Sequence, residues 1–273
     1  MIDSDRPAGS APVVRTAILI LTCSISSAKR LENARAQAHD VFGQAPVRVV
    51  DGFIGRDPEI DRIYDTEKAR RWCKRIPTRS EIAAYATHRL GWQTLLDSDF
   101  DHALLLEDDF YIRDPEIVRQ AVDRAGELLA QGRHIVKLFD FPRDRSRNLG
   151  VWTRAGGMSL VKWQRTRAGL VGYLISREGA KRFLSRKRVF RVVDEDIKFF
   201  WELGLDIWSI PGNPICETAM VLGGSLLQED RKRARGRNLM RSLKGIVLTL
   251  HRDWFTRYHF RRYRRLHRST EST

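Results

Sequence analysis

The feature that most constrains the fold is an alternation of short apolar runs with segments of helical character. The apolar runs predict β-strands at 16–22, 47–51, 102–108, 134–140, 169–176 and 206–211. Helices are expected between them at 28–42, 79–97, 115–131, from Arg177 onward and at about 194–203. This alternation is typical of an α/β fold with a largely parallel sheet. We see no internal repeat, and no domain linker before about residue 225.

The most informative segment is HALLLEDDFYI at 102–112, in which an apolar run leads directly into Glu107, Asp108 and Asp109. Three adjacent carboxylates at the end of a buried strand repel one another and lose solvation, so at least one pKa rises unless a cation is bound. Hard oxygen ligands of this kind suit Mn²⁺ or Mg²⁺ held jointly with phosphate oxygens. An acidic turn exposed to water is the alternative, and the apolar residues on both sides favour the metal site.

Several common motifs are missing from the sequence. No GxGxxG follows the first predicted strand, and no GxxxxGK[ST] run occurs anywhere, so dinucleotide oxidoreductases and P-loop NTPases lose support. The chain also lacks a GxSxG elbow, which disfavours an α/β-hydrolase.

The net charge of +15 is concentrated at the C-terminal end. Residues 231–273 carry 14 lysines and arginines against two acids, whereas residues 1–230 carry 35 against 32. The body of the chain is therefore nearly balanced, which is not the distribution of a uniformly basic nucleic-acid-binding domain.

The C-terminal segment has a regular apolar pattern. Apolar residues recur every three or four positions between Leu239 and Tyr263, namely Leu243, Val247, Leu250, Trp254 and Tyr258. A helical stripe with aromatic residues and flanking arginines predicts a basic amphipathic helix at the surface of an anionic membrane. The arginines alone would also fit a nucleic-acid-binding arm, but nucleic acid does not require the apolar stripe.

Cellular location and domain boundaries follow from the same patterns. No apolar run reaches the roughly 18–20 residues of a membrane-spanning helix. The AILIL run at 17–21 is too short and lacks the cleavage pattern of a secretory signal. The three cysteines form no CxxC pair and fit a reducing compartment. We expect a cytoplasmic protein, peripheral on the inner face of the plasma membrane, with a disordered lead at 1–13, one domain at 14–225 and a membrane-associating tail at 226–273.

Four segments stand out in this order: ILILTCSISSAKR (18–30), SEIAAYATHRLGWQ (80–93), ALLLEDD (103–109), and GLVGYLISREGAKRFL (169–184) followed by VVDEDIKFF (192–200). As an ordered set they resemble glycosyltransferase family 25, which includes bacterial lipooligosaccharide galactosyltransferases and collagen galactosyltransferases. Together they span about residues 16–220, which is most of the body of the chain. The chain departs from the family pattern at Ser80, Ala83, Ala84, Thr87 and the Leu170-Val171 pair.

The resemblance implies a GT-A-like nucleotide-sugar-binding domain that performs a metal-dependent, inverting transfer. The expected donor is a UDP-sugar, with galactose as the sugar, and the expected acceptor is a lipopolysaccharide, a lipooligosaccharide or another surface glycan. The triplet would hold Mn²⁺ or Mg²⁺ through Glu107, Asp108 and Asp109. Donor contacts are expected from Thr22, Arg30, Asp51, Glu81, His88 and Asp108.

Two of these expected donor contacts lie on one face of helix 79–97. Glu81, Tyr85, His88 and Trp92 are spaced by four, three and four residues, so they share that face. A donor-binding role for Glu81 and His88 competes with a structural one. In the structural role, Tyr85 and Trp92 pack in the core and His88 makes a single hydrogen bond.

A second acidic run, Asp194-Glu195-Asp196, opens the predicted helix at 194–203. Acids at this place commonly cap a helix and stabilise its first turn. An inverting transfer also needs a carboxylate within hydrogen-bond reach of the acceptor hydroxyl. Asp194 matches the "VD" position of the family and is the expected catalytic base, with Glu195 as the second candidate. Lys137, a basic residue within a predicted strand, is a further candidate for a pocket wall.

Two other functions fit parts of the sequence. A metal-dependent phosphoesterase also clusters carboxylates, although it would need more His and Asp ligands than the triplet offers. A non-catalytic membrane- or polyanion-binding protein on a transferase-like fold would explain the tail without requiring the triplet.

Overall fold

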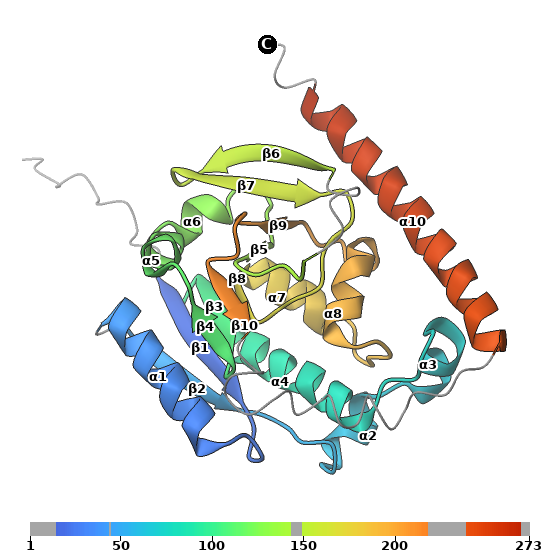
Figure 1. The fold of residues 1–273 in the computed structure, drawn as a ribbon, viewed down its shortest axis with the longest axis horizontal. Coiled ribbons are helices and arrows are strands. Elements are labelled where there is room, and N and C mark those ends of the chain that lie inside the picture. Colours follow the sequence, from blue (N-terminus) through green and yellow to red (C-terminus); the bar gives the residue numbers. More distant parts are fainter. Residues whose placement is uncertain (1–14, 44, 143–148, 218–238, 269–273) are drawn as a thin grey trace, which may run out of the picture.

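The structure is a computed structural model that describes residues 15–43, 45–142, 149–217 and 239–268 (Figure 1). The predicted lead at 1–13 and residues 226–238 of the predicted tail lie outside these ranges. Of the residues described, most form one α/β body around a central sheet, and a long C-terminal helix lies along one side of it. The predicted α/β class is confirmed.

The central sheet has eight strands and is mixed. Their spatial order is β2 (Val47–Asp51), β1 (Thr16–Thr22), β3 (His102–Glu107), β8 (Gly172–Ser176), β5 (Ile135–Lys137), β9 (Ile207–Ser209), β7 (Met158–Trp163) and β6 (Gly150–Ala155). Six of these strands run in one direction, and β8 and β7 run against them. The sheet is therefore parallel in its first three strands and mixed beyond them, which refines the largely parallel sheet expected from the sequence.

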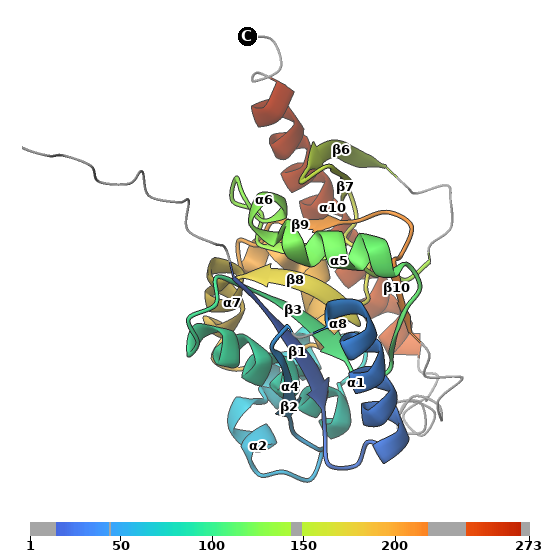
Figure 2. The same cartoon turned by 90° about the vertical axis from the view of Figure 1, so that its left-hand side faces the viewer.

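Strands β1 and β3 are buried on both faces, which explains their uninterrupted apolar sequences. On one face, their side chains pack against α1 (Ala28–Phe42), α5 (Pro115–Asp123) and α6 (Ala125–Leu128). On the other, they pack against α4 (Arg79–Leu96), α7 (Arg177–Leu184) and α8 (Val193–Asp196). Figure 2 shows α1 and α4 on opposite sides of β1. The body thus has three layers, with helices covering both faces of the sheet.

Helix α4 starts with a capping box and packs unusually close to the sheet. The Thr78 side chain accepts from the backbone N–H of Glu81, and the Glu81 side chain accepts from the backbone N–H of Thr78. Gly91 makes the close approach possible, because a Cβ there would lie 2.9 Å from side-chain atoms of both Leu21 and Leu105. The helix is therefore fixed in position relative to the ends of β1 and β3.

Several elements differ from the sequence prediction. The helix expected at 115–131 breaks at Arg124, whose backbone is non-helical, and the helix expected at 194–203 is α8 followed by the 3₁₀ helix η2 (Ile197–Glu202). Short helices α2 (Glu59–Ile63) and α3 (Thr66–Trp72) and the strands β4 (Phe110–Ile112) and β10 (Ile215–Glu217) were not predicted. Strands β4 and β10 pair antiparallel in a separate two-stranded sheet.

The predicted C-terminal helix is present as α10 (Leu239–Arg268). Val247, Leu250, Trp254 and Tyr258 of the predicted stripe are exposed on one face, and Phe260, which the stripe did not include, is buried against the body. Among the described residues, no helix combines the length and the apolar character needed to cross a bilayer.

Candidate active site

A cleft of about 410 Å³ opens where β1 and β3 end, beside the N-terminal half of α4. Ligands of open α/β sheets bind at such carboxyl ends of strands. Most of the predicted site residues line this one cleft: Thr22, Arg30, Glu81, His88, Glu107, Asp108, Asp109 and Asp194. Segments far apart in the sequence, namely the first strand, α4, the acidic triplet and the second acidic run, therefore meet at one place.

Two acids of the triplet share one arginine. Arg30 Nη2 donates to Asp109 Oδ2 at 2.6 Å, and Arg30 Nη1 lies 3.7 Å from Asp108 Oδ1. The Thr22 hydroxyl donates to Asp108 Oδ2 at 2.6 Å. Arg30 is 5% exposed and is the only lysine or arginine among the described residues that line the cleft. It stands in the first turn of α1, where the cap residue Ser27 fixes the start of the helix.

The third acid, Glu107, ends a chain of buried hydrogen bonds. Trp92 Nε1 donates to the Tyr173 hydroxyl at 2.7 Å, the hydroxyl lies 3.0 Å from His88 Nδ1, and His88 Nε2 lies 3.0 Å from Glu107 Oε1. Because the indole N–H is only a donor, the Tyr173 oxygen accepts from it. The two ring nitrogens of His88 have Tyr173 and Glu107 as their hydrogen-bond partners. Burial lowers the pKa of His88 to about 4, which agrees with a neutral imidazole.

The raised pKa values of Glu107 and Asp109 indicate that the negative charge of the triplet is not fully balanced by nearby positive charge. Burial, followed by the negative charges of Asp194, Glu217 and Asp108, raises the pKa of Glu107 to about 8. Burial and the charge of Glu107 raise the pKa of Asp109 to about 7, although Arg30 acts in the opposite direction. A bound cation would relieve this repulsion.

The donor set fits a divalent cation that is completed by its substrate. Within residues 15–43, 45–142, 149–217 and 239–268, no three His, Cys, Asp or Glu side chains are grouped to hold a metal by themselves. Mg²⁺ typically takes only one or two carboxylates from the protein, and substrate phosphates and water supply the other oxygens. Asp109 and Asp108 offer such carboxylate oxygens at the cleft.

In the second acidic run, only Asp194 faces the cleft. Its Oδ1 accepts from the backbone N–H of Gly169 at 3.0 Å. Glu195 instead bonds Lys198 Nζ at 2.6 Å and Arg252 Nη1 at 2.9 Å, and it lines a second pocket of about 250 Å³ between α10 and residues 191–199. The predicted alternative base Glu195 therefore lies outside the cleft.

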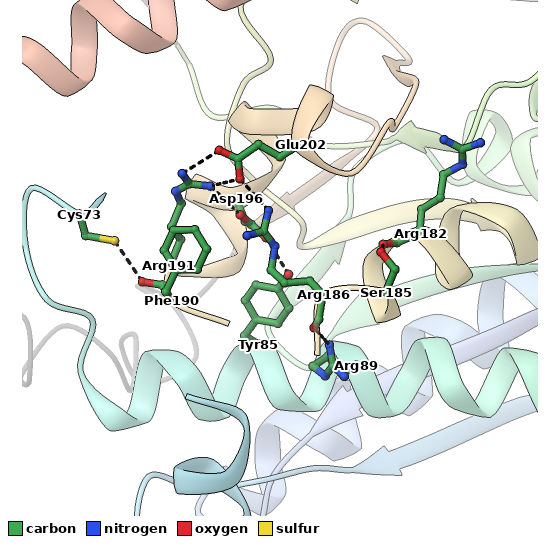
Figure 3. Close-up of polar contacts among 10 residues, drawn as sticks. All are labelled: Cys73, Tyr85, Arg89, Arg182, Ser185, Arg186, Phe190, Arg191, Asp196 and Glu202. Atoms are coloured by element: carbon green, nitrogen blue, oxygen red, sulfur yellow. Dashed lines mark hydrogen bonds and ion pairs between the residues drawn. The ribbon is translucent and has the colours of Figure 1, made fainter. Parts of the chain in front are cut away.

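Asp196 belongs to a buried structural network (Figure 3). It is 1% exposed, accepts from the Tyr85 hydroxyl at 2.8 Å and lies 3.2 Å from both Arg186 and Arg191. Arg191 also forms a bidentate pair with Glu202, at 2.7 and 2.9 Å. These contacts fix η2 and the end of α7 against α4, so the role of Asp196 is structural.

Lys137 does not line the cleft, and it supports Asp194 indirectly, through the backbone segment that contacts Asp194. The side chain is fully buried, and Nζ donates to Asp140 Oδ1 at 2.6 Å and to the backbone carbonyls of Arg167 and Ala168 at 2.8 and 3.0 Å. Burial lowers the pKa of this ammonium, while Asp140 opposes the shift. The three bonds hold the segment that leads into Gly169, the residue whose N–H binds Asp194. Lys137 is thus a positioning residue rather than the predicted pocket wall.

The structure places Asp51 outside the cleft as well. It ends β2 in register with Thr22, and its side chain is exposed. The neighbouring Gly52 is packed so closely that a Cβ would lie 2.2 Å from the Thr87 hydroxyl of α4. The Asp-Gly turn is therefore explained by packing against α4.

The shared face of α4 combines both roles considered for it. Tyr85 and Trp92 are fully buried, and the Trp92 ring stacks on Phe183 with centroids 4.1 Å apart. His88 is a cleft residue with two hydrogen-bond partners, rather than the single structural bond of the alternative. Glu81 completes the capping box, pairs with Arg75 at 2.6 Å and also borders the cleft.

Some cleft residues were not identified from the sequence. Glu217 reaches the cleft because β10 pairs with β4 and sets Glu217 opposite Phe110, next to the triplet. Ile25 and Phe141 add exposed apolar side chains at the cleft. No local pattern marks Glu217, since it is placed by the pairing of two distant segments.

Comparison with known proteins was informative at the level of the family. A model described as glycosyltransferase family 25 (LPS biosynthesis protein) matches residues 19–197. No curated protein matches the chain.

Solved structures show weak similarity. They include a Drosophila β-1,4-galactosyltransferase 7 mutant in complex with manganese, UDP-Gal and xylobiose (10% identity, 83% of this chain, 82% of that chain, TM-score 0.40). Another is glucosyl-3-phosphoglycerate synthase from Mycobacterium tuberculosis in complex with Mn²⁺, UDP-Glc and phosphoglyceric acid (15% identity, 92% and 86%, TM-score 0.34). A third is A197 from STIV (14% identity, 72% and 81%, TM-score 0.38).

The assignment rests on the family model, which spans the first strand, α4, the acidic triplet and Asp194. These are the segments that the fold brings together around the cleft. The chain belongs to glycosyltransferase family 25 and is a glycosyltransferase.

Proposed function

We propose that this transferase is a GT-A-type enzyme that moves a sugar from a UDP-sugar donor to a surface glycan, with inversion and with the help of a divalent metal. The observation that carries the proposal is the convergence of the acidic triplet and Asp194 on one cleft. The two segments lie more than 80 residues apart in the chain, and their meeting supplies both groups that an inverting transfer requires.

The donor diphosphate would bind beside the triplet. Arg30 offers a guanidinium to the phosphate oxygens, and such charge-assisted contacts are strong. This guanidinium contacts the carboxylates of Asp109 and Asp108. Mn²⁺ or Mg²⁺ bound at Asp109 and Asp108 would neutralise charge on the UDP leaving group. Galactose is the proposed sugar, on the basis of the family resemblance.

Asp194 would act on the acceptor hydroxyl. The N–H of Gly169 donates to one carboxylate oxygen of Asp194 and holds it in place. The buried Lys137 fixes the preceding residues by donating to their backbone carbonyls. The remaining oxygen of Asp194 can take the proton from the acceptor hydroxyl as the new bond forms. Because the groups that hold the carboxylate belong to the protein scaffold, its orientation does not depend on the donor.

Glu107 is proposed to orient the bound donor in the cleft rather than to transfer a proton. His88 holds its carboxylate, and the chain through Tyr173 and Trp92 fixes the imidazole. The proposed acceptor is a lipopolysaccharide or lipooligosaccharide, in keeping with the description of the family.

The test is to measure UDP release from a panel of UDP-sugars in the presence of a lipooligosaccharide acceptor and Mn²⁺. We expect turnover with UDP-galactose, its loss on chelation and its recovery with added Mn²⁺. Turnover that survives chelation would remove the metal from the proposal. Failure of every UDP-sugar to bind would remove the donor assignment.

A further inference from the structure

Helix α10 presents two different faces. Its inner face packs on the body, where the Trp201 ring stacks on Phe255 and His259 at centroid distances of 5.7 and 5.8 Å. Thr256 and Phe260 are buried on the same side. Arg165 pairs with Asp253 at 2.7 Å, and Arg252 pairs with Glu195 at 2.9 Å. The helix is therefore held in place by its inner face alone.

The outer face of α10 carries large apolar side chains that the described parts of the chain leave exposed. This outer face consists of Ile246, Val247, Leu250, Trp254 and Tyr258, whose exposed fractions lie between 49% and 64%. Their spacing sets them on one side of the helix, and Trp254 and Tyr258 stack on each other at 5.9 Å. A contiguous exposed apolar patch of this kind marks an interaction surface.

The charge around the outer face selects the partner. The exposed charged side chains of the second half of α10 are all arginines: Arg257, Arg261, Arg262, Arg264 and Arg265. Between 244 and 265 the only acid is Asp253, which Arg165 occupies from the inner side. A partner must therefore accept apolar and aromatic side chains together with a dense positive charge.

We propose that the outer face of α10 binds an anionic lipid surface, with the helix lying in the interface and its arginines at the lipid phosphates. Trp and Tyr beside an apolar stripe suit the boundary between headgroups and acyl chains. A second copy of this chain would bring the same arginines against these, so a symmetric dimer through this face is opposed by charge. The protein would then be peripheral at the inner face of the plasma membrane.

Lipid binding would also fix where the catalytic cleft lies. Arg252 on the inner face holds Glu195, whose neighbour Asp194 faces the cleft. Val192 borders both the cleft and the pocket beneath α10. Figure 1 shows α10 beginning near α3 and running past α8. The proposed base is thus tied, through one ion pair, to the helix that would lie on the membrane.

The test is co-sedimentation of the full chain with vesicles of phosphatidylcholine alone or mixed with phosphatidylglycerol. We expect binding to the mixed vesicles that weakens with salt, and at least a tenfold loss of affinity in a variant with Leu250→Ser, Trp254→Ser and Tyr258→Ser. The matched control is Leu149→Ser with Trp152→Ser, which removes two similarly exposed apolar residues at β6 and should bind as the wild type does.

Thermal unfolding of each variant shows whether the fold is retained, as expected for exposed positions. Equal vesicle binding by the triple variant and the wild type would overturn the proposal. A wild-type dimer that the triple variant converts to monomer, without vesicle binding, would assign the face to a second copy. Retention on duplex DNA without vesicle binding would assign it to nucleic acid.

Discussion

The chain contains two runs of three consecutive acids, and they behave differently. Glu107, Asp108 and Asp109 follow a strand, and all three line one cleft. The run at 194–196 lies in helix α8, and its side chains point to the cleft, to α10 and into the core. Successive residues of a helix are turned by about 100°, so three neighbours cannot share a target. Three consecutive acids at a strand end can therefore place their negative charges in one cleft. In a helix, each of three consecutive acids points to a different partner.

The largest effect within the second run is expected at Asp194. Asp194→Asn keeps the bond to the Gly169 N–H but removes the proton acceptor, so kcat should fall by roughly 10²–10⁴-fold. The affinity for UDP should be unchanged, because donor contacts lie at the triplet. Steady-state turnover and calorimetric UDP binding, measured on the same preparation, check both parts. Retained turnover would transfer the role of base to another residue.

Asp196 should affect stability rather than chemistry. Asp196→Asn removes one of the two carboxylates that pair with Arg186 and Arg191 and leaves Glu202 as the other, and the loss of one partner in a buried pair costs about 3–5 kcal/mol. Denaturant unfolding measures this loss. Activity per folded molecule should remain near that of the wild type, and a selective loss of kcat would show that the network reaches the cleft.

Glu202 gives the same network a pH dependence. Burial by itself would raise the pKa of Glu202, but the hydrogen bonds and charge of Arg191, with those of Arg186, outweigh burial and hold the pKa below its ordinary value of 4.5. A carboxyl with a lowered folded pKa contributes stability above the unfolded pKa and loses it as pH falls further. The melting temperature should therefore fall below pH 4.5 more steeply in the wild type than in Glu202→Gln. Parallel curves would contradict this.

The smallest effect is expected at Glu195. Its side chain is 37% exposed, and partly exposed ion pairs contribute about 0–1 kcal/mol. Glu195→Gln should change unfolding free energy by less than about 1 kcal/mol and leave kcat unchanged. A large loss of kcat would mean that the tie between α10 and the cleft segment controls the geometry of Asp194.

The sequence predicted what depends on local pattern. Uninterrupted apolar runs located β1 and β3, and the acids after β3 located the cleft, because a strand end at the sheet edge is a local property. Arg30, His88 and Asp194 were predicted from their positions in the family motifs, and they also line the cleft.

What the sequence missed depends on contacts between distant segments. Glu217 enters the cleft only through the pairing of β10 with β4, and Lys137 acts through the carbonyls of a loop 30 residues away. Asp51 was expected in the cleft from the family resemblance, but β2 is the edge strand of the sheet. The inner face of α10, with Thr256 and Phe260, was not predicted, because spacing alone does not show which side the body covers.

The central claim is that the acidic triplet forms the donor site, and thermal stabilisation by UDP with and without Mn²⁺ tests it most directly. A ligand that binds only the folded state raises the melting temperature. We predict a rise that needs both UDP and Mn²⁺ in the wild type and in Glu195→Gln, and that is absent in Asp109→Ala. An equal rise in Asp109→Ala, or no rise in the wild type with any combination, would contradict the account.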